Sequence, residues 1–586
     1  MRRTTLFLVV AGVLGCQGAG DVKKGETGAA GATAGAGATA GAGASNANAA
    51  GDEVVPVGAI TECPKSLGGA EKQHRVISKD CGVVPVTEDL AIDGGSLTLE
   101  AGASLAFKDG AGLTVGYSEA AKLIIKGTAE APVVFTSAGD KAPGVWRGVT
   151  LHENADRSKL QGLVIEYAGA GDDAALKVYA TDVVLEGSTI RESKTGLAVV
   201  DDGGFAGFSG NEFKKIGRPA AIEVRASAVG GLGAGNRFDG GAYVLVQGGA
   251  VRKSAKWQLV GAPLVIAEDI GIDGDKGQKT VLELVPGSEL KFAEGGAFNL
   301  GYYESAALLA KGTADAPVTF TAQDKRQAGG WTGIKVHAQG ELTLEHAVLE
   351  FGGQGDAGVI NLNEGSLSLT ASTLRSDLVG VVATPNSKIV AFADNKFVAT
   401  PLAVKLPASL VGSLGEGNAY DRDAKIKVEG NQVTGKALWR VQGVPLELTS
   451  DVAVEGELTL DAGLALLAGP DTGFTVGYYG TAALLAKGTA AAPVTIGPAD
   501  TAKGTWMGIV LHEKSTGNAF ENLVMTGASN ASAIEVKART NAKLTSVTCS
   551  KCAGAVVGWE CGATVTSSQV LAADGTPKID AKPDGC

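Results

Sequence analysis

A long internal repeat is the feature of this 586-residue chain that most restricts its fold. The segment GYSEAAKLIIKGTAEAPVVFT begins at Gly116, and close copies begin at Gly301 and Gly477. The unit is about 180 residues long and occurs three times, with the third copy shortened by the end of the chain. Such self-similarity predicts duplication of one scaffold. Each copy also carries a Trp-x-Gly-x-x-x-His segment, which ends at His152, His337 and His512.

A shorter period lies inside each long repeat. Asn-x-Phe segments begin at Asn211 and Asn236, and matching segments begin at Asn395 and Asn418, so the marker recurs about every 24 residues. Between the markers lie very short segments with alternating aliphatic residues, such as Leu97-Thr-Leu99, which predict strands of three to five residues. No segment of the body shows sustained helical amphipathicity. A unit of this size fits one coil of a parallel β-helix, in which stacked coils share one continuous core.

The motifs K-G-T-A-x-A-P-V-x-F and W-x-G-I carry a family resemblance. Over residues 95–560 the chain resembles secreted bacterial surface proteins with the right-handed parallel β-helix of the pectate-lyase-like superfamily. The resemblance implies an all-β, right-handed parallel β-helix solenoid, and about 24 residues per coil predict roughly 22 coils. A β-propeller is the rival all-β fold. Its blades take about 40–50 residues, and no such period occurs here.

The amino terminus predicts export and lipid attachment. Two arginines precede a short apolar stretch that ends at Gly15, which at about 18 Å is too short to cross a bilayer. The boundary Val13-Leu14-Gly15-Cys16 resembles the bacterial lipobox, which implies that residues 1–15 are a lipoprotein signal peptide and that Cys16 is lipidated. In that family Gln17 implies sorting to the outer membrane, on its periplasmic or surface-exposed side. An ordinary signal peptide is the alternative.

Residues 16–52 consist of the predicted lipidated Cys16 followed by a Gly/Ala-rich stretch, which predicts a flexible tether.

The charge of the chain restricts the partners that it can bind. Lys plus Arg number 51 against 63 for Asp plus Glu, a net charge of −12. An acidic chain without a basic cluster lacks the electrostatic footprint of a nucleic-acid-binding protein. The lipobox resemblance implies the membrane as one partner, through the lipid anchor, and the resemblance to surface β-helix proteins implies a polysaccharide or an envelope protein as another. No nucleic acid and no cofactor are predicted.

The remaining six cysteines lie near the two ends of the body, where a predicted amino-terminal cap spans 53–94 and a carboxyl-terminal cap or tail spans 561–586. An exported protein favours disulfides. Four cysteines at one end allow three pairings, which stay open. A C-x-x-C pair also has the spacing of zinc ligands, but a second such pair is missing, so no metal site is predicted. The disulfide candidates are Cys63 with Cys81, which would close the amino-terminal cap, and Cys549, Cys552, Cys561 and Cys586.

No motif predicts a catalytic site. The three repeated histidines are interpreted as turn residues, because an enzyme with one site needs no triplicated base. Asp201-Asp202 resembles the paired carboxylates of glycosidases with this fold, but the Gly-His-Gly and Arg-Ile-Lys motifs of that family are missing. The predicted function is a non-enzymatic, lipid-anchored scaffold or binding protein that contacts glycans or envelope components. A divergent polysaccharide lyase or glycoside hydrolase is the alternative.

Overall fold

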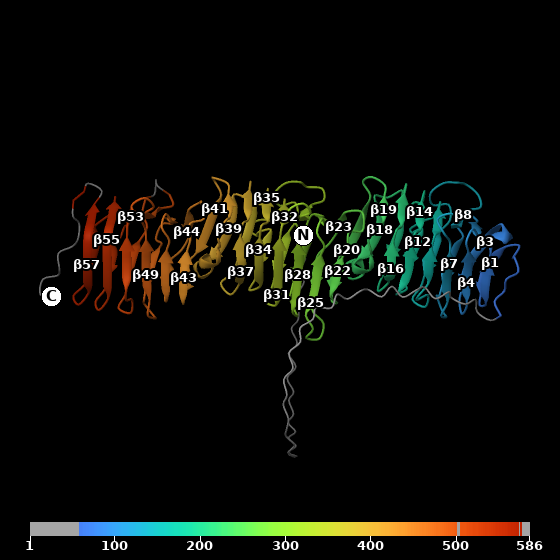
Figure 1. The fold of residues 1–586 in the computed structure, drawn as a ribbon, viewed down its shortest axis with the longest axis horizontal. Coiled ribbons are helices and arrows are strands. Elements are labelled where there is room, and N and C mark those ends of the chain that lie inside the picture. The colour runs from blue at the N-terminus through green and yellow to red at the C-terminus, as the bar shows by residue number, and fades with distance from the viewer. Residues whose placement is uncertain (1–57, 501–503, 573–574, 577–585) are drawn as a thin grey trace, which may run out of the picture. The chain divides into compact units, whose positions relative to one another are not determined.

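A computed structural model of the chain describes residues 58–500, 504–572, 575–576 and 586. They belong to one compact unit, Pro56–Cys586, and form an all-β parallel solenoid of about 20 turns. The turns follow one another along the stack in the order of the chain (Figure 1). The fold prediction is therefore confirmed, and the number of turns is close to the roughly 22 expected. The predicted signal peptide, Cys16 and the tether lie outside the described residues.

Most coils contain three short strands. Each strand pairs in parallel with the equivalent strand of the next coil, so side chains that point inward lie above one another. Two successive coils in the first repeat consist of β4 (Ser96–Glu100), β5 (Ser104–Phe107) and β6 (Gly112–Val115), followed by β7 (Lys122–Lys126), β8 (Val133–Ser137) and β9 (Gly148–Leu151).

The inward side chains form one continuous core. A single cluster of buried residues extends from Leu67 to Val570. Burial of one such aliphatic side chain stabilises the fold by about 1.5–3 kcal/mol, and no coil can bury its own row alone. The registers define vertical columns of buried residues, one of which contains Ile77, Leu99, Ile125, Leu160, Leu185 and Phe208.

The short sequence period marks a buried asparagine ladder. Oδ1 of Asn211 accepts a hydrogen bond from the backbone N–H of Ser188 one coil earlier, at 3.1 Å. Oδ1 of Asn236 in turn accepts from the N–H of Asn211, at 3.0 Å. These side chains satisfy backbone groups at a tight corner inside the solenoid, where water cannot reach them. The same ladder, built from Asn395 and Asn418, recurs in the second repeat.

Parallel pairing extends on both sides of the range 95–560 that the motifs mark. At the amino-terminal end β1 (Leu67–Glu71) pairs with β3 (Val83–Ile92). At the other end β57 (Thr564–Ala572) pairs with β55 (Asn541–Ser550). The end strands keep the spacing of the coils without carrying the repeated motifs, because pairing needs only a compatible backbone.

The three long repeats fold alike. Equivalent strands are β7, β28 (Ala306–Lys311) and β49 (Ala483–Lys487), all labelled in Figure 1. Equivalent short 3-10 helices, η2 (Ala226–Gly231) and η3 (Ala408–Ser413), interrupt the strands late in the first two repeats.

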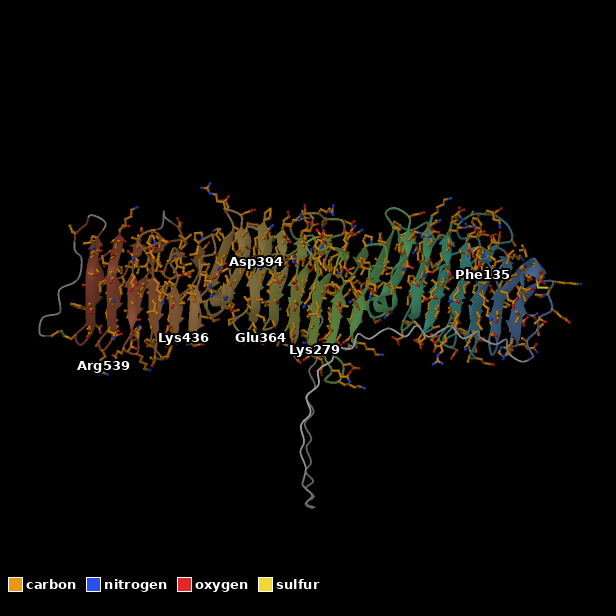
Figure 2. All side chains as sticks on the ribbon, viewed as in Figure 1. Phe135, Lys279, Glu364, Asp394, Lys436 and Arg539 are labelled. Atoms are coloured by element: carbon orange, nitrogen blue, oxygen red, sulfur yellow. A yellow bond between two sulfur atoms is a disulfide. The ribbon has the colours of Figure 1, made fainter. Side chains whose placement is uncertain are left out.

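Aliphatic and aromatic side chains fill the core, whereas most charged side chains lie outside it. In Figure 2 the labelled residues Lys279, Glu364, Lys436 and Arg539 lie along one margin of the solenoid, whereas Phe135 is fully buried.

Candidate functional site

Exposed tyrosines mark the same turn in each long repeat. The turn follows β6, β27 (Ala297–Leu300) and β48 (Gly473–Val476). Its tyrosines are between 54% and 70% exposed, and in the part of the chain that the structure describes no other aromatic side chain is strongly exposed. Repeated exposure of large aromatic rings is typical of interaction surfaces. We call these segments the tyrosine turns; they contain Tyr117, Tyr302 with Tyr303, and Tyr478 with Tyr479.

Each tyrosine turn begins with a glycine that the stacking of the coils requires. Gly301 has a φ of +62°, and a Cβ atom there would collide with the backbone of Gly340 in the next coil. Gly116 and Gly477 also have positive φ and equally close contacts with the next coil. Only glycine fits this backbone conformation and this close approach without strain. The position of the tyrosines is therefore set by coil-to-coil contact.

A carboxylate of the preceding coil holds each tyrosine turn. Oδ1 of Asp273 accepts a hydrogen bond from the backbone N–H of Tyr303 at 3.0 Å, and a second from the residue that follows. Asp93 and Glu455 accept equivalent pairs of hydrogen bonds in the first and third turns. The turns are thus anchored before any ligand arrives, which reduces the entropy lost on binding.

A histidine packs against the first tyrosine of each turn. In the second repeat the ring centroids of Tyr302 and His337 are 4.8 Å apart and the ring planes meet at 85°. This edge-to-face contact further restricts the exposed ring. The same contact occurs in the other repeats, between Tyr117 and His152 and between Tyr478 and His512.

The histidines of the second and third turns favour the neutral form. Burial lowers the pKa of His337, and Lys335 lowers it further against the opposing effect of Asp273. Burial also lowers the pKa of His512, with a further contribution from Lys537. The structure places all three histidines directly after a strand. The contact of these histidines with the tyrosines was not predicted from the sequence. The Gly-Tyr pair that recurs in every repeat could have indicated that a tyrosine lies at an equivalent place in each.

A charged groove in the first repeat contains the Asp201-Asp202 pair. The groove has a volume of about 880 Å³, lies beside η2, and is also lined by Arg225, Arg252 and Lys253. A guanidinium nitrogen of Arg225 lies 3.5 Å from the Asp201 carboxylate. Acidic and basic side chains therefore share one concave surface, which suits a polar ligand rich in hydrogen-bonding groups.

The scaffold beside this groove recurs in the second repeat, but its charges do not. When η2 is aligned with η3, Arg225 corresponds to Pro407, and Arg252-Lys253 corresponds to Thr434-Gly435. Through the equivalent strands, Asp201-Asp202 corresponds to Pro385-Asn386. The coils therefore stack without these charges, so the charges are not a requirement of the fold.

The structure pairs the six described cysteines in three disulfides. At the carboxyl-terminal end, where the sequence allowed three pairings, Cys549 pairs with Cys552 and Cys561 pairs with Cys586. The second of these connects the last residue to the coils, and Cys63 pairs with Cys81 as expected. Within the described ranges, no group of three or more His, Cys, Asp or Glu side chains is placed to hold a metal ion.

Comparison of the chain with known protein families and with curated proteins finds no match. Among residues 58–500, 504–572, 575–576 and 586, no helix is long and apolar enough to cross a bilayer. The geometry of the described residues offers two kinds of candidate site, the three tyrosine turns and the charged groove.

Proposed function

We propose that this protein is a non-enzymatic, lipid-anchored scaffold of the bacterial outer membrane that binds glycans through its three tyrosine turns. The observation that carries the proposal is the repetition of an exposed, pre-positioned tyrosine at equivalent places in all three long repeats. The outer membrane and the lipid on Cys16 rest on the lipobox resemblance. The solenoid would then be held at the membrane on its periplasmic or surface-exposed side.

The size and chemistry of the tyrosine turns favour a sugar. One or two rings beside a histidine cover far less than the roughly 800 Å² that each partner contributes to a stable protein interface. A pyranose ring matches an aromatic ring in size, and its C–H face packs on the π surface while its hydroxyls stay in water. Three equivalent turns also suit a ligand made of repeated units. The net charge of −12 disfavours polyanionic ligands.

Binding tests this proposal. The full chain carrying Cys16→Ser, which cannot be lipidated, is titrated calorimetrically with a panel of neutral and acidic polysaccharides. We expect binding to neutral members, and loss of at least tenfold in affinity in the variant Tyr117→Ala/Tyr302→Ala/Tyr303→Ala/Tyr478→Ala/Tyr479→Ala. The matched control replaces exposed aliphatic residues outside the turns, Val83→Ala/Leu259→Ala/Val390→Ala. Equal binding by both variants would contradict the role of the tyrosines.

The anchor needs a separate experiment. Three acyl chains hold a protein firmly at a membrane, whereas one chain holds it weakly. The wild-type chain is expected to partition into the detergent phase and the Cys16→Ser chain into the aqueous phase. If both partition identically, the lipoprotein proposal is wrong, and the glycan proposal is unaffected.

The charged groove supports a second candidate, a divergent polysaccharide lyase or glycoside hydrolase. Two adjacent carboxylates beside Arg225, Arg252 and Lys253 supply groups capable of acid and base chemistry. Incubation of the Cys16→Ser chain with the same polysaccharides distinguishes the candidates. Release of unsaturated or reducing ends, abolished by Asp201→Asn/Asp202→Asn, would overturn the non-enzymatic proposal.

A further inference from the structure

The three tyrosine turns do not extend from one sheet. The sheet that contains β6 continues coil by coil through parallel pairing into the second repeat. In the second repeat this sheet reaches β29, which is the equivalent of β8. The equivalent of β6 is β27, which lies in a different sheet, so equivalent strands are displaced from one sheet to another between repeats. The successive strands are β6, β9, β12 (Leu176–Val178), β15 (Leu197–Val199), β18 (Ala220–Arg225), β20 (Tyr243–Gln247), β23 (Leu264–Ile266), β26 (Glu289–Phe292) and β29 (Val318–Ala322).

The same displacement occurs between the second and third repeats. The sheet that contains β27 reaches β50, the third equivalent of β8, whereas β48 lies in another sheet with β42 (Gln432–Val433) and β45 (Val452–Val454). The strands that lead from β27 are β30 (Gly333–Val336), β33 (Ile360–Leu362), β36 (Val379–Ala383), β39 (Leu402–Pro407), β41 (Lys425–Glu429), β44 (Leu446–Leu448), β47 (Ala465–Ala468) and β50 (Val494–Pro498).

The displacement arises where a 3-10 helix packs on the end of a sheet. The six-stranded sheet of the first repeat ends at β16 (Phe205–Ser209), against which η2 packs. Soon afterwards β21 (Gly249–Val251) starts a new sheet, which continues through β24 (Ile270–Ile272) to β27. In the second repeat η3 packs on β37 (Lys388–Ala393) in the same way, and β42 starts the next sheet. Each of the first two long repeats therefore contains seven coils plus part of another.

We infer that the three tyrosine turns face different directions around the solenoid axis and hold separate glycan chains, so that the protein cross-links a polysaccharide. Seven coils at about 4.8 Å each separate successive tyrosine turns by about 34 Å along the axis. A straight chain seated on Tyr302 and following one sheet would not meet the next tyrosine turn, because the equivalent strand has moved to another sheet. This inference rests on the proposed glycan binding.

The chemistry of the turns narrows the ligand to a neutral chain with equatorial hydroxyls, such as a β-1,4-glucan. Equatorial hydroxyls leave both faces of each pyranose ring covered with C–H groups, which can pack on a tyrosine ring. An acidic residue adjoins the second turn, where Glu304 directly follows Tyr303. It disfavours a chain of uronic acids at this turn through like-charge repulsion.

Two probes of different length test the inference on the full Cys16→Ser chain. Cellotetraose is too short to reach two tyrosine turns, whereas soluble hydroxyethyl cellulose is long enough to reach several. By calorimetry we expect three tetraose sites per protein, two sites in Tyr302→Ala/Tyr303→Ala, and an unchanged Kd at the sites that remain. With the polymer we expect cross-linking, seen as a rise in light scattering, which Tyr302→Ala/Tyr303→Ala/Tyr478→Ala/Tyr479→Ala abolishes. Val390→Ala is the control, with an exposed side chain outside the turns.

The possible failures are distinguishable. If one polymer chain lies along all three turns, the polymer binds as a 1:1 complex without cross-linking, and each lost tyrosine turn weakens polymer binding by about tenfold or more through lost avidity. That result overturns the inference and leaves glycan binding intact. If neither probe binds, the β-glucan class is wrong, and the panel experiment decides whether any glycan binds.

Discussion

Oδ1 of Asp377 accepts a hydrogen bond from the backbone N–H of Gly352 at 2.7 Å, inside the solenoid. The Asp377 side chain is fully buried, and its Oδ2 atom has no hydrogen-bond partner among the described residues. Desolvation raises the pKa of this carboxyl well above its usual range, and Glu350 raises it further, against the effect of the Gly352 hydrogen bond. In the first repeat Ser193 occupies the equivalent position, and its Oγ accepts from the N–H of Ala168 at 3.2 Å.

Asp377→Ser is therefore expected to stabilise the protein at neutral pH by about 1–3 kcal/mol, the usual cost of a buried unsatisfied polar atom. The folded protein retains a proton that the unfolded chain releases above about pH 4. Wild-type stability should therefore fall as the pH rises from about 4 toward the folded pKa, and this slope should be missing in the variant. Guanidinium unfolding at several pH values measures both effects. Identical pH profiles would contradict the raised pKa.

Gly301→Ala is expected to cost more stability than Gly295→Ala. Both residues have positive φ, so each alanine costs about 1–2 kcal/mol in backbone strain. Only at Gly301 would the new methyl group also collide with the next coil, whereas the space around Gly295 is open. We expect a further cost of about 1–3 kcal/mol at Gly301 from overpacking. Chemical unfolding compares the two variants, and equal costs would argue against the tight stacking of the tyrosine turns.

The imidazoles of His337 and His512 are expected to titrate below pH 6.5, because burial lowers their pKa. Since the unfolded chain binds protons more readily, the wild-type protein should lose stability relative to His337→Gln as the pH falls through this range. NMR titration of the imidazole signals, assigned with His337→Gln and His512→Gln, measures the pKa values. Midpoints at or above 6.5 would disagree with the half-buried environment of these rings.

Cys63→Ser/Cys81→Ser is expected to loosen the amino-terminal coils selectively. The disulfide joins residues 18 apart in sequence, and closure of a loop of this size stabilises a fold by about 3 kcal/mol. In a solenoid each coil contacts only its neighbours, so the effect should stay near one end. Hydrogen exchange should increase in β1 and β3 and remain unchanged in β55. Cys549→Ser/Cys552→Ser is the control, and uniform loss of protection in either variant would show that the ends are coupled.

Much of the fold could be predicted because its determinants are local. The alternation of aliphatic residues and the Asn-x-Phe period identify which side chains point inward and how often the chain returns to the same face. The asparagine ladder at Asn211 and Asn236 is the structural cause of that period. Parallel pairing continues on both sides of residues 95–560, and no sequence motif marks it there, because the end coils lack the repeated segments.

Sequence alone determined that short aliphatic strands stack as coils, that the scaffold is triplicated, and that the cysteines gather at its ends, because these properties follow from patterns within one coil or from residue positions. Tertiary structure decided the rest. The contact of Tyr302 with His337, the pairing of Cys561 with Cys586, and the move of β27 to a different sheet from β6 all join segments that are distant in sequence. The first two depend on which segments the stacking of coils brings together, and the third depends on where η2 and η3 interrupt the strands. No pattern within a single coil encodes either.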